Sequence, residues 1–303
     1  VQFGPITIEE HKPEVVSLPS RVRMFVDETR VSANTPIEAG TAVQLRPSGS
    51  SYLITATPVI TCTPSGTAVE VTDNGDGTYT FVMPSEDVEI LAEVKSNIAS
   101  VEITINDVEW TGETVTPMME TWLDESNYDL SYKKDGEEIA AEDIIATGEY
   151  TAVFTGKGNY AGVQEVNFLV IRREAVSIPK ETYVTRFFNG EMQYTDFSDK
   201  VKFYVVTAVT DNEVVLAEVE SKQIPANTPF LIYNEGTSTT DFDLMDDGTP
   251  AEALTVEVAP EFKGTDEARE FAETEDVDYY ICNGKNFVYV KGAGTLAAHR
   301  CWL

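Results

Sequence analysis

Acidic side chains are the most abundant groups in this sequence that could do chemistry. The chain has 52 Asp and Glu against 21 Lys and Arg, which gives a formal net charge of −31. Paired carboxylates serve glycoside hydrolysis, but among so many acids some pair always falls within range, so their abundance does not indicate a catalytic site. The negative field disfavours nucleic acid and anionic membranes as partners. Divalent-cation binding is one explanation of the acidity, and solubility is the simpler one.

Two glycine-rich runs look at first like ligand-binding loops. Asp73–Thr78 has the composition of a calcium loop, but that loop needs ligand side chains at alternate positions and a Glu at position twelve, where this chain has glycine and proline. Gly156–Asn159 lacks the strand-loop-helix setting of a phosphate-binding loop. Both runs are typical of hairpin turns. We therefore predict that Gly77 and Gly158 occupy tight turns that need a positive φ or a close backbone approach.

The sequence offers few nucleophiles and bases. His11 and His299 lie near opposite ends of the chain, so they cannot form a multi-histidine metal site. Cys62, Cys282 and Cys301 are too scattered for a disulfide scaffold or a zinc site. Cys282 and Cys301 could pair, but we predict unpaired thiols. No Gly-x-Ser-x-Gly elbow occurs. We therefore predict that the protein is not an enzyme and has no catalytic, cofactor-binding or metal-binding residues.

The three tryptophans are the remaining candidates for ligand contact. Trp110, Trp122 and Trp302 could form a platform on which sugar rings stack. Aromatic residues in β modules more often pack in the core or at an edge, and we predict that role here. The sequence does not indicate which residues bind a ligand.

The elements that must position these residues are predicted to be strands. Stretches rich in β-branched and aromatic residues recur between Gly, Pro, Asn and Asp, and no window of about a dozen residues has a helical stripe. We predict an all-β fold, with one helical turn at Asp266–Phe271 capped by Thr265. No apolar run reaches the roughly 20 residues that span a bilayer. The clearest strands are expected at Tyr79–Val82, Val101–Ile105, Thr151–Phe154, Val201–Val205 and Phe287–Val290.

Strand-like runs end in polar residues at two places, Lys95–Ser100 and Arg172–Pro179. These junctions predict three domains, residues 1–97, 98–172 and 173–303. The first two are expected to be immunoglobulin-like β-sandwiches in tandem, followed by a larger all-β C-terminal domain. Because the junctions are too short to fold back, an elongated chain is expected.

The first two predicted domains share a local pattern, Gly77–Val82 and Gly148–Val153. In immunoglobulin-like sandwiches, a tyrosine near the start of the penultimate strand bonds through its hydroxyl to backbone upstream, an arrangement called the tyrosine corner. Tyr79 and Tyr150 are candidates for that role. The alternative is that they are surface tyrosines.

Several phrases of the sequence carry family resemblances. Asp76–Val94 resembles the closing hairpin of the internalin-type bacterial surface β repeat, and Ala39–Leu45 resembles an earlier strand of it. The middle of the chain resembles the bacterial immunoglobulin-like repeats of adhesins, although Trp110 stands where Tyr or Phe is usual. The matching phrases are, in order, Trp110-Thr111-Gly112, Pro117, Tyr128–Tyr132, Gly148-Glu149-Tyr150, and Thr155–Gly162 through Phe168.

The last predicted domain resembles a C-terminal module of unknown function from secreted Bacteroidetes-type proteins. The phrases that carry this resemblance are Tyr183–Phe188, Ile224–Leu231 and Gly294–Leu303. The resemblances imply an exported, multidomain, non-catalytic surface protein. The lack of an apolar leader at Val1 is expected of a mature or trimmed product.

We therefore expect a non-catalytic protein that is extracellular or at the cell surface and serves adhesion or scaffolding through protein–protein contacts. A glycan-binding protein is the alternative, and a glycoside hydrolase accessory protein is a distant one. The partner would be an unknown protein or glycan at the cell surface. Two or more coplanar, solvent-facing aromatic rings would favour a glycan, whereas a flat polar face or a free sheet edge would favour a protein.

Overall fold

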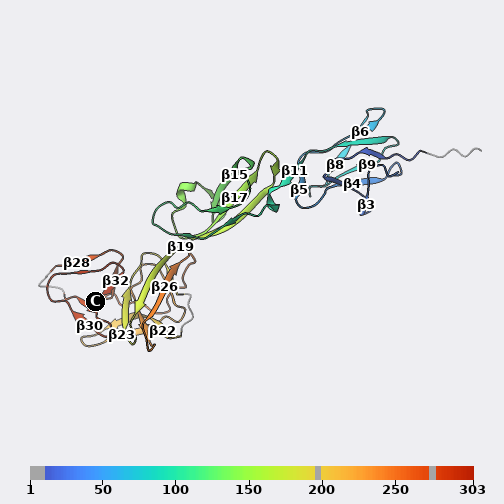
Figure 1. Cartoon of the computed structure of the whole chain (residues 1–303). Helices are drawn as coiled ribbons and strands as arrows, with labels where there is room; N and C mark the ends of the chain where they lie inside the picture. The colour runs from blue at the N-terminus through green and yellow to red at the C-terminus, as the bar shows by residue number, and fades with distance from the viewer. Residues whose placement is uncertain (1–10, 195–198, 273–277) are drawn as a thin grey trace, which may run out of the picture. The chain divides into compact units, whose positions relative to one another are not determined.

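The computed structural model describes residues 11–194, 199–272 and 278–303 (Figure 1). Within these ranges the secondary structure consists of strands and three short 3₁₀ helices, η1 (Ile98–Ser100), η2 (Glu125–Asn127) and η3 (Ala141–Asp143), with no α-helix. The all-β fold predicted from the sequence is therefore confirmed.

The chain divides into two compact units. Unit 1 holds the described residues up to Ile105, together with Met119–Lys133 and Thr151–Val166. Unit 2 holds Asn106–Met118, Lys134–Tyr150 and the described residues from Asn167 to Leu303. Residues 98–172, expected to be one module, thus contribute to both units. The division into three domains stays a prediction.

Unit 1 contains two sheets that share one core. The first sheet has the order β1-β10-β6-β7 and the second β3-β2-β4-β9-β8. The first is formed by β1 (Val15–Ser17), β10 (Asp87–Leu91), β6 (Val59–Thr63) and β7 (Ala68–Val69). The second is formed by β3 (Thr29–Val31), β2 (Val22–Val26), β4 (Ala42–Pro47), β9 (Tyr79–Val82) and β8 (Val71–Asp73).

Alternation along the strands explains this core. Val43 and Leu45 of β4 are fully buried, and they pair across the sheet with Phe81 and Tyr79 of β9, which are also buried. Residues two apart on a strand share a face, so each strand gives one face to the core. Both sheets contribute to a single hydrophobic cluster, in which Ile90 of β10 represents the first sheet. Burying each such side chain contributes about 1.5–3 kcal/mol.

The other strands of unit 1 are short, except for β15 and β17, whose ends at Lys134 and Gly148–Tyr150 belong to unit 2. A three-stranded sheet has the order β18-β11-β5, β12 pairs with β14, and β15 pairs antiparallel with β17. Their bounds are β5 (Tyr52–Ile54), β11 (Val94–Asn97), β12 (Thr104–Ile105), β14 (Met119–Glu120), β15 (Tyr128–Lys134), β17 (Gly148–Gly156) and β18 (Tyr160–Ala161).

The predicted junction Lys95–Ser100 differs from the structure. Its first half is strand β11, and Ser96 pairs with Tyr160 of β18, so backbone pairing outweighs the polar side chains. The Asn97 side chain then accepts a hydrogen bond from the Ala99 N–H and starts η1. Because this turn occupies the following residues, the strand predicted at Val101–Ile105 is reduced to the two residues of β12.

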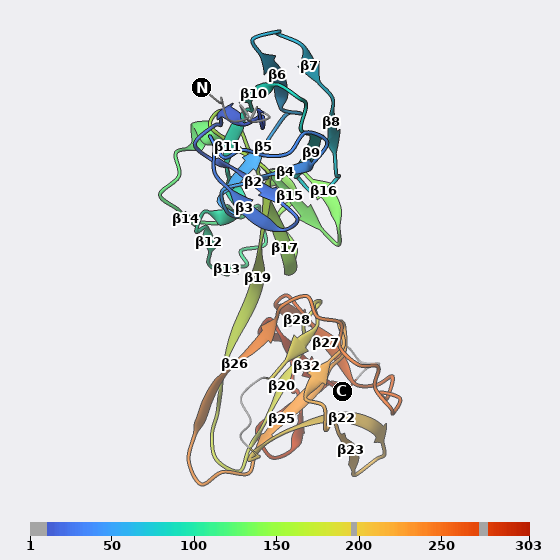
Figure 2. The same cartoon turned by 90° about the vertical axis from the view of Figure 1, so that its right-hand side faces the viewer.

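Unit 2 holds four sheets (Figure 2). The hydrogen-bonded orders are β16-β15-β17-β19-β26-β21-β24, β20-β25-β22-β23, β27-β32-β29-β30 and β28-β31, while β13 pairs parallel with β19. The bounds are β13 (Val108–Glu109), β16 (Glu137–Ile139), β19 (Val163–Ile178), β20 (Tyr183–Arg186), β21 (Met192–Gln193), β22 (Val201–Val209), β23 (Val214–Glu218), β24 (Gln223–Ile224), β25 (Phe230–Asn234), β26 (Thr240–Asp246), β27 (Lys263–Thr265), β28 (Arg269–Phe271), β29 (Tyr280–Cys282), β30 (Phe287–Tyr289), β31 (Gly294–Leu296) and β32 (Arg300–Trp302).

Two predictions in unit 2 are wrong. No strand ends at Arg172, because β19 continues to Ile178 and its last seven residues pair with β26, burying Val176 and Ile178. The helical turn at Asp266–Phe271 does not form either. Thr265 ends β27 and its hydroxyl donates to the Glu267 carbonyl instead of capping a helix. Residues 269–271 form β28, which buries Phe271 against Trp302, so tertiary pairing overrides the local helix signal.

Candidate functional site

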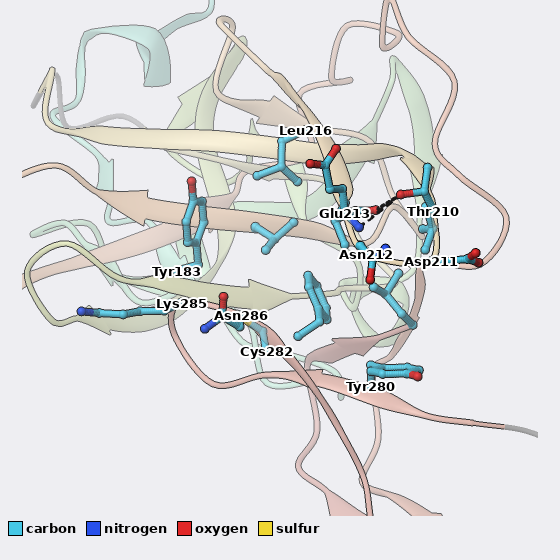
Figure 3. A pocket seen from close by; sticks show the side chains of 15 residues that line it. Tyr183, Thr210, Asp211, Asn212, Glu213, Leu216, Tyr280, Cys282, Lys285 and Asn286 are labelled. Carbon is cyan, nitrogen blue, oxygen red and sulfur yellow. Dashed lines mark hydrogen bonds between the residues drawn. The ribbon is translucent and has the colours of Figure 1, made fainter.

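A hollow of about 730 Å³ lies in unit 2 between two β-hairpins (Figure 3). One hairpin joins β22 to β23 through the tip Thr210–Glu213, and the other joins β29 to β30 through the tip Asn283–Asn286. Residues of β20 and β25 and the chain end at Leu303 complete the wall. The hollow is therefore bounded by two different sheets.

The floor of the hollow is apolar. Val214 and Leu216 of β23 are two residues apart and so present their side chains to the same side of the strand. Leu231 of β25 is 2% exposed and anchors the floor in the core of unit 2. Phe287 of β30 packs edge-on against the buried Phe262, with ring centroids 6.1 Å apart. These contacts hold the floor in place.

The tip Thr210–Glu213 forms one side of the rim. The Thr210 N–H donates to the Glu213 carbonyl at 2.9 Å, and the Glu213 N–H donates to the Thr210 hydroxyl oxygen at 3.1 Å. These two bonds close the turn, and Asp211 and Asn212 are exposed at its end. Figure 3 marks the hydrogen bonding between Thr210 and Glu213 with dashed lines, which includes a bond from the Thr210 hydroxyl to the Glu213 carbonyl. The acidic side chains of the tip are thus held next to the start of β23.

The tip Asn283–Asn286 forms the other side of the rim. The Asn283 side-chain oxygen accepts from the N–H groups of Lys285 at 3.1 Å and Asn286 at 2.9 Å. The Asn283 N–H in turn donates to the Asn286 carbonyl at 2.9 Å. In the view of Figure 3, Lys285 and Asp211 lie at opposite ends of the hollow. The rim therefore carries charges of both signs around an apolar floor.

Two titratable groups of the hollow, the Cys282 thiol and the Tyr183 hydroxyl, are harder to ionise than usual because they are partly buried. Burial raises the pKa of the Cys282 thiol above its usual range, against a smaller opposing effect of a hydrogen bond from the Gly284 backbone. Burial, followed by the neighbouring Tyr233, also raises the pKa of Tyr183. Cys282 is therefore not activated as a thiolate. An apolar floor with a polar rim is suited to binding.

Two further hollows lie elsewhere. One of about 410 Å³ adjoins the first, since Tyr183 and Cys282 line both, and it also contains Arg300. Another, of about 640 Å³, lies on unit 1 beside Val59 and Leu91, which are 59% and 65% exposed. Neither is bounded by two hairpins as the first is.

The tyrosine corner is confirmed for one of its two candidates. Tyr150 is 1% exposed at the start of β17, and its hydroxyl donates to the Ala146 carbonyl, four residues upstream, at 2.8 Å. Tyr79 is also buried, but its hydroxyl has no hydrogen bond among the described residues. Tyr79 is therefore a core residue and not a corner, and neither tyrosine is a surface residue.

Both glycine-rich runs form turns, as predicted. In Asp73–Thr78 the Asp73 carboxylate accepts from the Gly75 N–H at 2.8 Å, so this side chain is used within the turn. Gly77 has φ of 80°. In the second run, Gly158 has φ of 63° and the Tyr160 N–H donates to the Lys157 carbonyl. Within the described ranges no group of three or more His, Cys, Asp or Glu is arranged to hold a metal ion.

The tryptophans have three different environments. Trp302 is 5% exposed and packs in the core of unit 2, as predicted. Trp110 is half-buried beneath the Arg172 guanidinium, whose carbon lies 4.8 Å from the ring centroid. Trp122 is 71% exposed, so the prediction of a packing role is wrong for it. The next residue, Leu123, is 5% exposed, so the chain buries this leucine and leaves the Trp122 ring in solvent.

The cysteines carry free thiols in the described structure, and the histidines pair with carboxylates. Cys301 is fully buried, and its thiol donates to the Arg186 carbonyl at 2.8 Å. His299 lies 2.9 Å from Asp266 and stacks on Phe188. No helix among the described residues is long and apolar enough to cross a membrane.

Comparison with known proteins returned no match to a protein-family model, to a curated protein or to a solved structure.

The hollow has no continuous signal in the sequence. Its lining comes from segments that are up to 120 residues apart, from Tyr183 to Leu303, and only the folded sheets bring them together. A usable signal was present in the two polar turns, Thr210–Glu213 and Asn283–Asn286, each lying between runs of apolar strand residues.

Proposed function

We propose that this chain is an exported, non-catalytic surface protein that serves adhesion or scaffolding by binding another protein at the hollow between the two hairpins. The resemblance to bacterial surface repeats and adhesin modules supports the location and the general role. One observation carries the choice of ligand: the hollow has an aliphatic floor and lies against a strand, β23, at the open end of its sheet. Apolar side chains of a protein partner fit such a floor.

The aromatic residues near the hollow argue for a protein and against a glycan. Tyr280 and Tyr289 are 37% and 48% exposed, but their rings are inclined at 61° with centroids 5.7 Å apart. The two rings therefore do not form one flat platform, and a sugar that stacks on one ring contacts only the edge of the other. Val214 and Leu216 add aliphatic surface that offers a sugar no hydrogen bonds.

A glycan remains the second candidate because one observation favours it. Exposed tyrosine rings lie near asparagine and acidic side chains, and sugar-binding sites combine such groups. Tyr280, Asn212 and Asp211 all line the hollow.

The test uses the full chain as bait for a phage library of random linear peptides and, in parallel, for a glycan array. We expect peptides to be enriched and the array to stay blank. The variant Leu216→Gln places a polar side chain in the apolar floor and should abolish the enrichment. Val215→Gln is the matched control, since Val215 is 47% exposed, adjoins Leu216 on β23 and does not line the hollow.

Circular dichroism of both variants checks that they fold. Glycan signals that are lost in Leu216→Gln and kept in Val215→Gln would establish the glycan alternative. Peptides bound equally by the parent and Leu216→Gln would refute the hollow as the binding site.

A further inference from the structure

The strand β23 (Val214–Glu218) is an open sheet edge that is longer than the other edge strands and lacks basic residues and proline. It has five residues and is the longest strand at the end of any sheet among the described residues. Its sequence, Val-Val-Leu-Ala-Glu, contains no Lys, Arg or Pro. Natural edges are commonly protected by short length, by lysine or by proline. β23 has none of these three protections, although its pairing with β22 has a register shift between Val206 and Ala208.

The other edge of the same sheet is covered, which makes the openness of β23 a specific feature. At β20 the Tyr183 N–H donates to the Gly284 carbonyl at 2.8 Å, and the Thr185 hydroxyl accepts from the Cys301 N–H at 3.2 Å. By contrast, β23 has only β22 as a strand neighbour among the described residues, and no backbone–backbone bond outside the sheets involves Val214–Glu218 there. The Val215 carbonyl accepts a bond from the Thr207 hydroxyl of β22, on the inner side of the strand. Backbone groups on its outer side are thus left for a partner.

The open edge and the apolar floor belong to one place. Val214 and Leu216 of β23 line the hollow, and Phe287 of β30, the end strand of another sheet, lines it as well. A strand added beside β23 would turn every second side chain toward the hollow, with a spacing of about 6.6 Å. Backbone hydrogen bonds would then give affinity, and the hollow would give selectivity for apolar side chains.

Charge indicates what flanks those apolar residues. Asp211 and Glu213 are exposed at the tip that precedes β23, and neither forms an ion pair among the described residues. Glu218 at the far end of β23 is paired with Lys202 at 3.0 Å. The acids free to attract a ligand therefore lie at one end, in a chain whose net charge is −31.

On the basis of the proposed function, we propose that the partner supplies an extended peptide segment that adds to β23 as a further strand. Apolar side chains at alternate positions of this segment enter the hollow, and a Lys or Arg beside them meets Asp211 and Glu213.

The test uses the peptides enriched in the display experiment. A series of synthetic copies carries one backbone N-methyl group each, which deletes one donor without changing the side chain. We expect alternate positions to lose about tenfold in affinity for the full chain, the equivalent of one hydrogen bond. The intervening positions should change much less. A uniform or absent effect would overturn strand addition.

The charge arm uses the double variant Asp211→Asn, Glu213→Gln. It should weaken binding several-fold at low salt, with the difference vanishing at high salt. Glu89→Gln, an exposed acid of unit 1, is the control and should bind like the parent. Equal binding by the double variant would refute the basic flank.

Peptide binding at the hollow and strand addition to β23 are refuted by different results. Peptides that need Leu216 but tolerate N-methylation everywhere would leave the proposed function standing and remove strand addition. A library that yields no peptide at all would refute the proposed function and the strand with it.

Discussion

Replacing Tyr150 by Phe tests the tyrosine corner through a single atom. The hydroxyl donates to the Ala146 carbonyl at 2.8 Å and accepts from the Lys134 ammonium at 3.2 Å. Phe keeps the stacking on Phe168 and the position of the ring beneath the ammonium. Ala146 is exposed, so water can satisfy its carbonyl in the variant. The Lys134 ammonium keeps its bond to the Thr147 carbonyl. We therefore expect a loss of about 1 kcal/mol in the free energy of unfolding, the net value of the bond to Ala146.

The matched control is Tyr79→Phe. Tyr79, like Tyr150, stands two residues after a glycine and is buried, but its hydroxyl has no hydrogen bond among the described residues. We expect a change of less than about 0.5 kcal/mol. The two substitutions remove the same atom, so the difference between them reports the corner alone.

Hydrogen exchange followed by mass spectrometry assigns each effect to its segment. Exchange from β17 should quicken about fivefold in Tyr150→Phe, because 1 kcal/mol corresponds to that factor, while exchange from β9 should stay unchanged in Tyr79→Phe. Equal effects of the two substitutions, or no effect at Tyr150, would refute the role of the hydroxyl bond.

Three further predictions follow from backbone conformation and burial. Gly77→Val and Gly158→Val should each cost about 1–2 kcal/mol, since φ is 80° and 63°, and calorimetry showing a parent-like melting profile would contradict this. Burial lowers the pKa of Arg186 from 12.5 to about 10, equivalent to about 3 kcal/mol. Because the folded-state pKa is below the unfolded one, the charged guanidinium destabilises the fold at every pH below about 10. Arg186→Met should therefore raise the free energy of unfolding at pH 7, measured in urea. A clear loss of stability would show instead that the guanidinium stabilises the fold. Burial also raises the pKa of the Cys301 thiol, so iodoacetamide at pH 8 should leave Cys301 unmodified until urea unfolds the chain, and rapid labelling of the folded protein would contradict its burial.

The elements that could be predicted from sequence are those whose side-chain pattern and backbone pairing agree. Tyr79–Val82 and Val201–Val205 alternate buried with less buried residues and lie inside observed strands. The helical turn predicted at Asp266–Phe271 is wrong because its acidic first turn is only a local signal. Residues 269–271 form a strand because they pair with Gly294–Leu296. A pattern read in a short window does not contain that partner.

The site could be predicted only at its turns. The polar tips are local features, but the floor depends on Leu216 and Leu231 facing Phe287, and these come from different sheets. Likewise, a sequence does not say which strand ends a sheet. That β23 is open while β20 is covered depends on contacts with Gly284 and Cys301, about a hundred residues further along the chain.

The open edge and the acidity of the chain have to be considered together. An unprotected edge strand is a template for pairing with another copy of the same chain, which usually leads to aggregation. Two copies paired in parallel along β23 would bring together the acidic tips at Asp211 and Glu213. Two copies paired antiparallel would instead place each tip near Glu218 of the other copy, in molecules that each carry a net charge of −31. This repulsion opposes self-pairing without covering the edge, and it is absent for a basic partner. The acidic tip therefore opposes self-pairing, as lysine or proline does on other edges, and it leaves the backbone of β23 accessible to a strand of opposite charge.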